Sequence, residues 1–405
     1  MTYVAAIGTY SPPWSLKGRR VKGPDEDALT MAVAAGRAAD AAATAERVVL
    51  VSRDFPLIEG GNGAVLLAAL SLPAETPVAE VLGGAPAVLD QVTNASPYTL
   101  VIGADDNETS TGAVAVLTGV GEPTLTPVAR HAGSLPLVVR RDDGTRNTYV
   151  DPRLQREVGI RGTVKRLGLA GGCVVAAVAG VPGNQLGAGV DVTGAVEELQ
   201  ATAAAVLRVL THAIENHTVG LVVAAEQSTI SVAELHGGAT TRIVRDEVTA
   251  RELPVSTVTK GVGIPISMPA YSRAFEPKIR WEAAVFEERP GIDTNPVFPP
   301  RMRVDNSGVL AREYRLEPLP RTGTVYTHTT VRIPVPDLPS PYSLAVVQLD
   351  DSPVRVLLKV TGVPAGEATI GQPGSVVLRR IAVRTGVPDY GYAFWPGRTE
   401  EGVNA

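Results

Sequence analysis

The sequence predicts an α/β protein in which a large layered domain precedes a small all-β domain. Three observations lead to this prediction. Over residues 1–250, apolar β-branched runs typical of buried strands alternate with alanine-rich helical segments. From residue 321 the pattern changes to five short strand-like runs. A length of 405 residues fits two or three domains of roughly 150 residues each.

The chain opens with the pattern of a β–α–β unit. Residues 3–8 (YVAAIG) form an apolar strand, and SPPW ends it. The segment 23–27 (GPDED) predicts a helix start, because Pro24 suits a first helical turn and acidic groups stabilise the positive end of the helix dipole. An alanine-rich helix follows from Ala28, and residues 47–52 (RVVLVS) form a buried strand.

The next elements continue the alternation. An apolar helix follows Gly63, residues 86–93 form a short amphipathic helix, and residues 99–105 and 111–119 form buried strands. Residues 120–165 are polar with basic patches, which predicts an irregular excursion with little helix.

The pattern then partly repeats. Residues 173–181 are a strand, 194–214 a long amphipathic helix and 219–227 another buried strand. Strand–helix–strand units in both halves favour α/β layers with strands buried on both faces, and they indicate a weak internal duplication.

Three domains follow from the changes in composition. We expect residues 1–255 to form the α/β domain and 256–320 a proline-rich connector with one helix. The five strand-like runs within 321–400 fit a small Greek-key barrel of the OB type.

Composition excludes several functional classes. The net charge of −5 and an aromatic content of 4% speak against a nucleic-acid binder. One cysteine excludes a disulfide framework and a four-thiolate zinc site. The N-terminus lacks the pattern of a secretory signal, and no run of 18 apolar residues occurs. We therefore expect a cytoplasmic protein with no membrane partner.

The first part of the chain resembles a known family. AAIGTYSPPW, GPDEDALTMAVAAGRAA, LVIGAD with GAVAVL, and AVLRVLTHAIENHTVGLVVAA resemble the 3-hydroxy-3-methylglutaryl-CoA synthase branch of the thiolase superfamily. The resemblance covers roughly residues 1–250. It implies the duplicated α-β-α-β-α thiolase fold and chemistry on acyl-CoA.

The catalytic positions of that family are altered here. The resemblance places the cysteine nucleophile at about Ala85, where no thiolate can form. Arg53 and Asp54 stand near the position of the general acid/base glutamate, and the histidine segment is not recognisable. Asn184 lies in a segment similar to the family's asparagine loop. These changes predict that the ancestral site is silent, with Asp54 and Asn184 the remaining catalytic candidates.

The last third resembles the OB-fold domain that accompanies thiolase-superfamily enzymes. YSRAFEPKIRWEAAVFEERP, VFPPR, GTVYT and VPAGEATIGQPGSVVLR carry this resemblance over about residues 268–398. In that family a rubredoxin-like zinc ribbon with two Cys-x-x-Cys pairs precedes the barrel. The matching segment here, MRVDNSGVLAREYRLEPLP, has no cysteine, so we expect no zinc and a metal-free loop or β-strap.

Three functions compete. The first is a non-catalytic, acyl-CoA-associated subunit that scaffolds or docks substrate for an active acyltransferase, thiolase or aldolase. Its partner would be a catalytic thiolase-superfamily subunit, or a second copy through the thiolase-like domain. The second is an active acyltransferase or C–C lyase with a rebuilt, cysteine-independent site. The third, an OB-fold nucleic-acid binder, is disfavoured by the charge.

Several residues allow both a functional and a structural interpretation. Lys17, Arg19, Arg20 and Lys22 share one loop and suit a CoA phosphate, although a solvated basic loop is the alternative. Coenzyme A esters are thus possible ligands, and no tightly bound cofactor is expected.

A cysteine and an acidic cluster also allow both a functional and a structural interpretation. Cys173 is either a relocated nucleophile or, more simply, a small buried hydrophobe. Asp105, Asp106 and Glu108 form an acidic cluster that could hold a hard metal, although a solvated loop is favoured.

Overall fold

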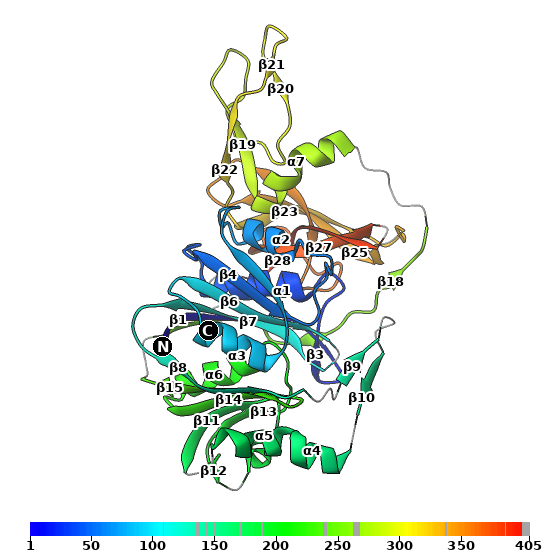
Figure 1. The fold of residues 1–405 in the computed structure, drawn as a ribbon. Coiled ribbons are helices and arrows are strands. Elements are labelled where there is room, and N and C mark those ends of the chain that lie inside the picture. The colour runs from blue at the N-terminus through cyan, green and yellow to red at the C-terminus, as the bar shows by residue number, and fades with distance from the viewer. Residues whose placement is uncertain are drawn as a thin grey trace. The chain divides into compact units, whose positions relative to one another are not determined.

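The chain folds into two compact units, drawn in Figure 1. The computed structural model describes residues 1–398 apart from 108, 135–137, 142–144, 150, 170–171, 188, 238–240, 262–267, 337 and 385. Unit 1 comprises Met1–Ser11, Ala34–Gly63 and Glu75–Asp246, and unit 2 comprises Pro12–Val33, Ala64–Ala74 and the chain from Glu247 onward. The predicted domain boundaries at residues 255 and 320 stay predictions.

A mixed twelve-stranded sheet forms the framework of unit 1. Its strands are β1 (Thr2–Ser11), β4 (Arg47–Ser52), β5 (Val78–Leu82), β6 (Thr99–Asp106), β7 (Thr111–Gly119), β8 (Thr124–Ala132), β11 (Cys173–Ala179), β12 (Val190–Asp191), β13 (Val196–Glu198), β14 (Gly220–Glu226), β15 (Thr229–His236) and β16 (Arg242–Glu247). They lie in the order β12-β11-β14-β15-β8-β1-β7-β6-β4-β5, with β13 beside β11 and β16 beside β1.

The sheet consists of two halves that have the same strand order. The order β5-β4-β6-β7-β1 is repeated by β13-β11-β14-β15-β8, in the same sequence along the chain. In each half the first three strands are parallel neighbours and the last two pair antiparallel. The halves join where Thr2 and Tyr3 of β1 pair with Leu125 and Thr124 of β8. The predicted duplication is confirmed.

Helices lie between and outside the two halves. One hydrophobic core contains α3, α6 and strand residues of both halves, so these two helices form the central layer. On the outer face of β1, Gly8 packs against Ala35 and Ala39 of α1. On the outer face of β11, Val164 of α5 joins a second core. These are the predicted α-β-α-β-α layers. The helices are α1 (Ala28–Ala39), α2 (Asn62–Ala69), α3 (Ala85–Thr93), α4 (Pro152–Val158), α5 (Ile160–Leu167) and α6 (Ala205–Glu215).

Two local predictions were wrong. The helix predicted over residues 194–214 begins only at Ala205, because its first residues instead form β13 beside β11. Residues 120–165, predicted to be irregular, contain β8, α4 and α5. They also contain a hairpin of β9 (Val138–Arg140) and β10 (Arg146–Thr148). Strand partners outside the predicted segments stabilise β13, which pairs with β11, and β8, which pairs with β15.

Unit 2 contains the predicted five-stranded barrel. Its strands close in the order β23-β25-β26-β28-β27. Along β25 every second residue is buried, with Ala345, Val347 and Leu349 filling the interior. The strands are β23 (Thr322–Val331), β25 (Tyr342–Leu349), β26 (Arg355–Val360), β27 (Pro373–Arg384) and β28 (Val387–Pro396).

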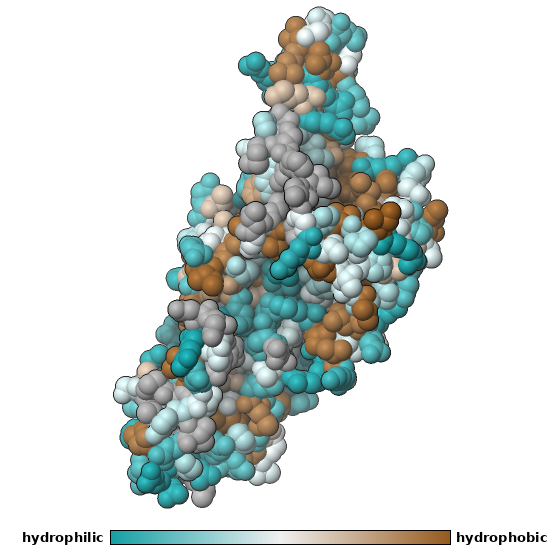
Figure 2. All heavy atoms as spheres, turned by 90° about the vertical axis from the view of Figure 1, so that its right-hand side faces the viewer, coloured by the Kyte–Doolittle hydropathy of each residue, from teal (hydrophilic) through white to brown (hydrophobic). Residues whose placement is uncertain are grey.

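A lobe formed by residues 268–318 precedes the barrel, in the segment that the family resemblance matches to a zinc ribbon. Helix α7 (Met268–Arg280) leads into β19 (Glu282–Phe286), which pairs with β22 (Tyr314–Pro318). Between them lies a small hairpin of β20 (Arg303–Val304) and β21 (Leu310–Ala311). Apolar side chains gather at the hairpin end of this lobe, at the top of Figure 2.

The N-terminal strands of unit 2 form a small separate sheet. Strand β2 (Trp14–Leu16) pairs with β3 (Arg19–Val21) and with β17 (Arg251–Glu252). A two-stranded pairing also joins β18 (Thr257–Val258) to β24 (Pro339–Ser340). Across the part of the chain that the structure describes, no helix has both the length and the apolarity needed to cross a bilayer.

Candidate functional site

The position predicted for the nucleophile lies at the start of α3. Gly84 precedes the helix, and Ala85 begins it with none of its surface exposed. The amide N–H of Ala85 donates to the carbonyl oxygen of Ala201 (3.2 Å). A Cβ on Gly84 would overlap the same carbonyl group. The Ala201 backbone therefore packs against the chain at Gly84 and Ala85, and the Ala85 side chain has no contact with solvent.

An ion pair flanks the same position. Arg53, after β4, pairs with Glu226 at the end of β14, and their side chains are 34% and 14% exposed. A Cβ on Gly84 would stand 2.8 Å from Glu226 Oε2 and 3.0 Å from an Arg53 guanidinium nitrogen. The two charges thus satisfy each other beside α3. Sequence reasoning noted Arg53 and missed Glu226, although Glu226 ends the buried strand β14.

Asp54 lies next to this ion pair. Its carboxylate accepts hydrogen bonds from the backbone N–H of Asp106 (3.2 Å) and from Asn107 Nδ2 (3.3 Å). Arg140 places a guanidinium nitrogen 3.5 Å from Asp54 and donates to the carbonyl oxygen of Arg53 (2.7 Å). The contacts of Asp54 therefore position the turn after β6. Its catalytic role stays a prediction.

Asn184 is exposed to solvent on a separate turn. The turn is the 3-10 helix η1 (Gly183–Leu186), and the N–H of Gly183 donates to Glu197 (3.1 Å). In the described part of the chain, Asn184 shares no hydrogen bond with Asp54. The two predicted residues are therefore not joined into one polar cluster.

The four basic residues predicted to contact CoA lie in the β2–β3 hairpin. Lys17 and Gly18 form its turn with φ of 52° and 76°. Arg20 donates to the carbonyl oxygens of Pro12 (2.5 Å) and Val248 (2.6 Å), so its guanidinium ties the hairpin to the chain. Lys17, Arg19 and Lys22 are exposed. A phosphate contact of this hairpin stays a prediction.

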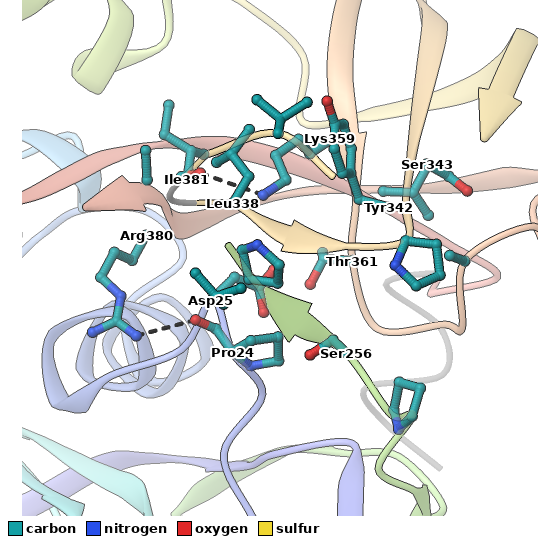
Figure 3. Close-up of a pocket in the computed structure, with 18 of the residues that line it drawn as sticks. Pro24, Asp25, Ser256, Leu338, Tyr342, Ser343, Lys359, Thr361, Arg380 and Ile381 are labelled. Atoms are coloured by element: carbon teal, nitrogen blue, oxygen red, sulfur yellow. Dashed lines mark hydrogen bonds between the residues drawn. The ribbon is translucent and has the colours of Figure 1, made fainter. Parts of the chain in front are cut away.

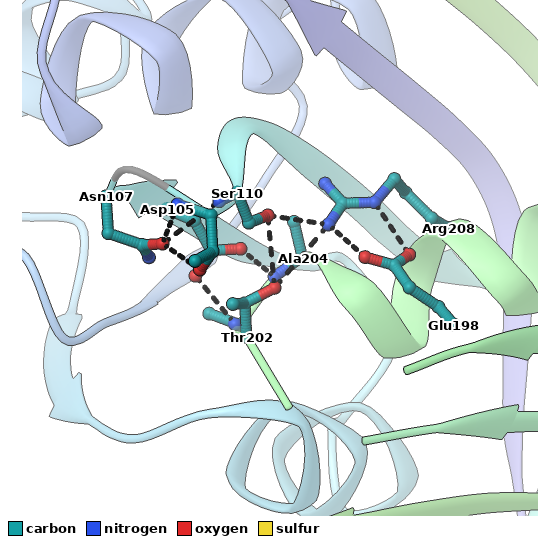
Figure 4. Close-up of polar contacts among 9 residues, drawn as sticks. Asp105, Asn107, Ser110, Glu198, Thr202, Ala204 and Arg208 are labelled. Atoms are coloured by element: carbon teal, nitrogen blue, oxygen red, sulfur yellow. Dashed lines mark hydrogen bonds and ion pairs between the residues drawn. The ribbon is translucent and has the colours of Figure 1, made fainter. Parts of the chain in front are cut away.

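A buried polar network centres on Asp105, as Figure 4 shows. Asp105 is 2% exposed, and its two carboxylate oxygens accept the N–H groups of Ala203 and Ala204 at 2.8 Å each. Nearby, Arg208 donates to Glu198 (2.6 and 2.9 Å). Burial raises the pKa of Asp105, while the Arg208 charge and the amide hydrogen bonds oppose that rise. The carboxylate caps the start of α6, contrary to the solvated loop that was favoured.

The remaining candidates do not form a reactive centre. Cys173, half-buried at the start of β11, packs against the aliphatic core beneath α5, as the structural interpretation predicts. Of the acidic cluster, Glu108 lies outside the described residues. Among the residues that the structure describes, no three His, Cys, Asp or Glu side chains are grouped so that they could hold a metal ion.

The lobe does not fit the zinc that the family resemblance implies. Its centre is a small hydrophobic cluster of Ala284, Phe286, Ile292, Val297 and Ala311. A structural zinc ribbon is held by thiolate or imidazole ligands, and the segment from β19 to β22 contains neither cysteine nor histidine. Side-chain packing holds this lobe together in place of a metal.

Comparison with known proteins supports the same architecture. A family model described as "ChsH2, C-terminal OB-fold domain" matches residues 316–379. No curated protein matches the chain.

Three solved structures illustrate the similarity. 3-Oxoacyl-(acyl carrier protein) synthase III, FabH, from Pseudomonas aeruginosa PAO1 is 15% identical with a TM-score of 0.46, over 59% of this chain and 98% of that one. HMG-CoA synthase complexed with CoA is 13% identical with a TM-score of 0.44, over 58% of this chain and 83% of that one. The Ltp2-ChsH2(DUF35) aldolase is 19% identical with a TM-score of 0.25, over 31% of this chain and 93% of that one.

The duplicated strand order and the matched barrel define the class. Unit 1 has a duplicated α-β-α-β-α architecture, with two equivalent five-stranded halves around the central helices α3 and α6. The chain joins this fold to an OB-fold domain in unit 2.

Proposed function

We propose that this chain is a non-catalytic, acyl-CoA-associated subunit that docks substrate for a catalytic thiolase-superfamily partner in the cytoplasm. One observation carries the proposal. At the start of α3, Ala85 replaces the nucleophile, and its amide is bonded to the Ala201 carbonyl oxygen. A thiolase-type enzyme needs an accessible thiolate at a helix N-terminus.

The charges around α3 support the same proposal. General acid–base catalysis requires a group with a free proton-transfer path to substrate. Arg53 and Glu226 pair with each other, and Asp54 contacts Arg140 and the turn after β6. These side chains are thus held by structural partners, whereas general acid–base catalysis would require them to exchange a proton with substrate.

An exposed strand edge supports a role in assembly. Strand β5 is the last strand on one side of the described sheet, with only β4 beside it. Val78 and Leu82 on β5 are 36% and 74% exposed. An apolar edge strand is a surface on which another chain can add a strand. A catalytic subunit or a second copy of this chain would fit there.

The test compares CoA-ester turnover by the isolated chain with turnover by the chain and its co-expressed partner. The substrates are acetyl-CoA and a longer acyl-CoA, and product is followed by mass spectrometry. Asp54→Ala and Asn184→Ala are compared with Asp191→Ala, which changes an exposed aspartate elsewhere in unit 1.

We expect the isolated chain to be inactive and the complex to be active with all three variants. Ala85→Cys should form no acyl-enzyme, because the side chain at position 85 is fully buried. Turnover by the isolated chain that disappears in Asp54→Ala or Asn184→Ala, but not in Asp191→Ala, would replace the proposal with the rebuilt-enzyme hypothesis.

A further inference from the structure

Unit 2 contains a large cavity outside the thiolase-like site. Its volume is about 1140 Å³, slightly above the roughly 300–1,000 Å³ typical of small-molecule sites. All its lining residues belong to unit 2. They come from the loop before α1, the segment around β18 and β24, and barrel strands β25, β26 and β27. The pairing of β18 with β24 fixes one rim of the cavity.

Most of the cavity wall is apolar. Prolines and branched aliphatic side chains line it, among them Val255, Leu338 and Val363. Val255 is 89% exposed and Val258 is 59% exposed, although both belong to the cavity wall. Leaving such side chains against water is unfavourable, at about 25 cal/mol per Å² of apolar surface. An apolar ligand would remove this surface from water.

Lys359 brings an ammonium group to this apolar cavity. Figure 3 shows Lys359 beside Tyr342, with Asp25 and Thr361 across the cavity. Lys359 Nζ lies 5.5 Å from the centre of the Tyr342 ring and donates to the carbonyl oxygen of Ile381 at 3.3 Å. An ammonium group has three N–H donors, and this carbonyl uses one of them. Burial lowers the pKa of Lys359, and the Asp25 carboxylate opposes that effect.

Lys359 shares the described cavity wall with one further cation and one carboxylate. Arg380 donates to the carbonyl oxygen of Pro24 at this wall. Asp25, whose carboxylate acts on Lys359, also lies 4.0 Å from Arg379. Among the lining residues that the structure describes, two cationic side chains thus stand against one carboxylate.

We propose that this cavity binds an apolar carboxylate, whose carboxylate group pairs with Lys359 Nζ and whose hydrocarbon body packs on the proline and valine wall. This site goes beyond the proposed acyl-CoA role, because it needs neither coenzyme A nor a partner subunit. It also assigns a function to Lys359, which sequence reasoning passed over as an ordinary barrel residue.

The test is isothermal titration of the full chain with decanoate. Matched probes of the same chain length are the neutral 1-decanol and the cationic decyltrimethylammonium. Lys359→Met removes the charge while keeping a side chain of similar length, and Ala365→Trp places a bulky ring in the cavity wall without changing its charge. Lys165→Met, on the exposed face of α5, is the control.

We expect one decanoate to bind per chain, and the two other probes to bind more weakly. Lys359→Met should raise the Kd by about tenfold to a hundredfold, the effect of one charge-assisted hydrogen bond. Ala365→Trp should abolish binding, and Lys165→Met should leave it unchanged. Tryptophan fluorescence melting checks that each variant is folded.

Any of three results would overturn the proposal. They are no binding of decanoate to the wild-type chain, binding of decyltrimethylammonium as tight as decanoate, and unchanged decanoate affinity in a folded Lys359→Met or Ala365→Trp variant. Because the titration contains no CoA ester and no partner, its outcome is separate from the test of the acyl-CoA role.

Discussion

The buried ion pair between Arg379 and Glu26 makes a quantitative prediction about unit 2. Both side chains are 1% exposed, and their closest polar atoms lie 3.3 Å apart. Arg379 also donates to Thr361 Oγ1 (3.3 Å) and to the carbonyl oxygen of Leu378 (3.1 Å). Glu26 accepts the N–H of Gly23 at 2.7 Å. The pair therefore links the segment before α1 to the barrel strand β27.

The perturbation is Arg379→Met, which keeps much of the side-chain volume and removes the charge. It leaves Glu26 buried without its cation, so we expect unit 2 to lose about 3–5 kcal/mol of unfolding free energy. In urea, with an m-value of about 2 kcal/mol/M, the midpoint should fall by roughly 1.5–2.5 M. The double variant Arg379→Met with Glu26→Gln should recover part of this loss, because the unpaired carboxylate is gone.

Tryptophan fluorescence isolates this effect. The three tryptophans of the chain are Trp14, Trp281 and Trp395, and all lie in unit 2. Urea unfolding followed at this signal therefore reports unit 2 even when unit 1 unfolds separately. A shift of the urea midpoint by less than about 0.5 M in Arg379→Met, which corresponds to about 1 kcal/mol, would refute the reasoning. Full additivity of the stability losses of the two single variants in the double variant would refute it as well.

Three further predictions concern the lobe, the sheet edge and Asp105. A chelator should leave the tryptophan melting curve unchanged, while Phe286→Ala should cost about 3–5 kcal/mol because Phe286, 2% exposed, fills the core of the lobe; a chelator-induced shift would contradict the metal-free packing. Leu82→Lys should prevent association at β5 in size-exclusion chromatography, while Val219→Lys, an exposed apolar position elsewhere in unit 1, should not; equal behaviour of both would exclude β5. Burial raises the pKa of Asp105 in the folded state above its ordinary value of 3.8. The contribution of Asp105 to the free energy of unfolding should therefore be complete below pH 3.8, and it should be lost as the pH rises through the folded-state pKa. Relative to Asp105→Asn, wild-type stability by circular dichroism should therefore fall over that window, and an opposite slope would refute the burial argument.

Strands and layers were largely predictable because their signals are local. The apolar runs at residues 99–105 and 111–119 lie within β6 and β7, and five barrel strands occur where five runs were counted. Burial on both faces of a sheet requires continuous apolar sequence, which is visible within six to nine residues. That position 85 carries no thiol was equally visible, since residue 85 is alanine.

The long-range partners of the acidic segment before α1 could not be predicted from neighbouring residues. It was predicted as a helix start, and Asp27 does accept the N–H of Thr30 at 2.9 Å. Glu26 and Asp25, however, interact with Arg379 of the barrel, and Asp27 also accepts from Tyr390 (2.9 Å). Residues more than 350 positions away thus determine what most of these carboxylates do.

The sequence by itself determined the two-part α/β and barrel architecture, the internal duplication and the lack of a thiol at position 85. Only the tertiary structure decided that Asp105 caps α6, about a hundred residues further along the chain. It also decided that Lys359 reaches a cavity lined by segments that lie far apart in the sequence. The physical reason is the separation along the chain over which each effect acts. Hydrophobic periodicity and turn chemistry act between near neighbours in sequence, whereas the packing of distant segments sets the partner of a buried charge.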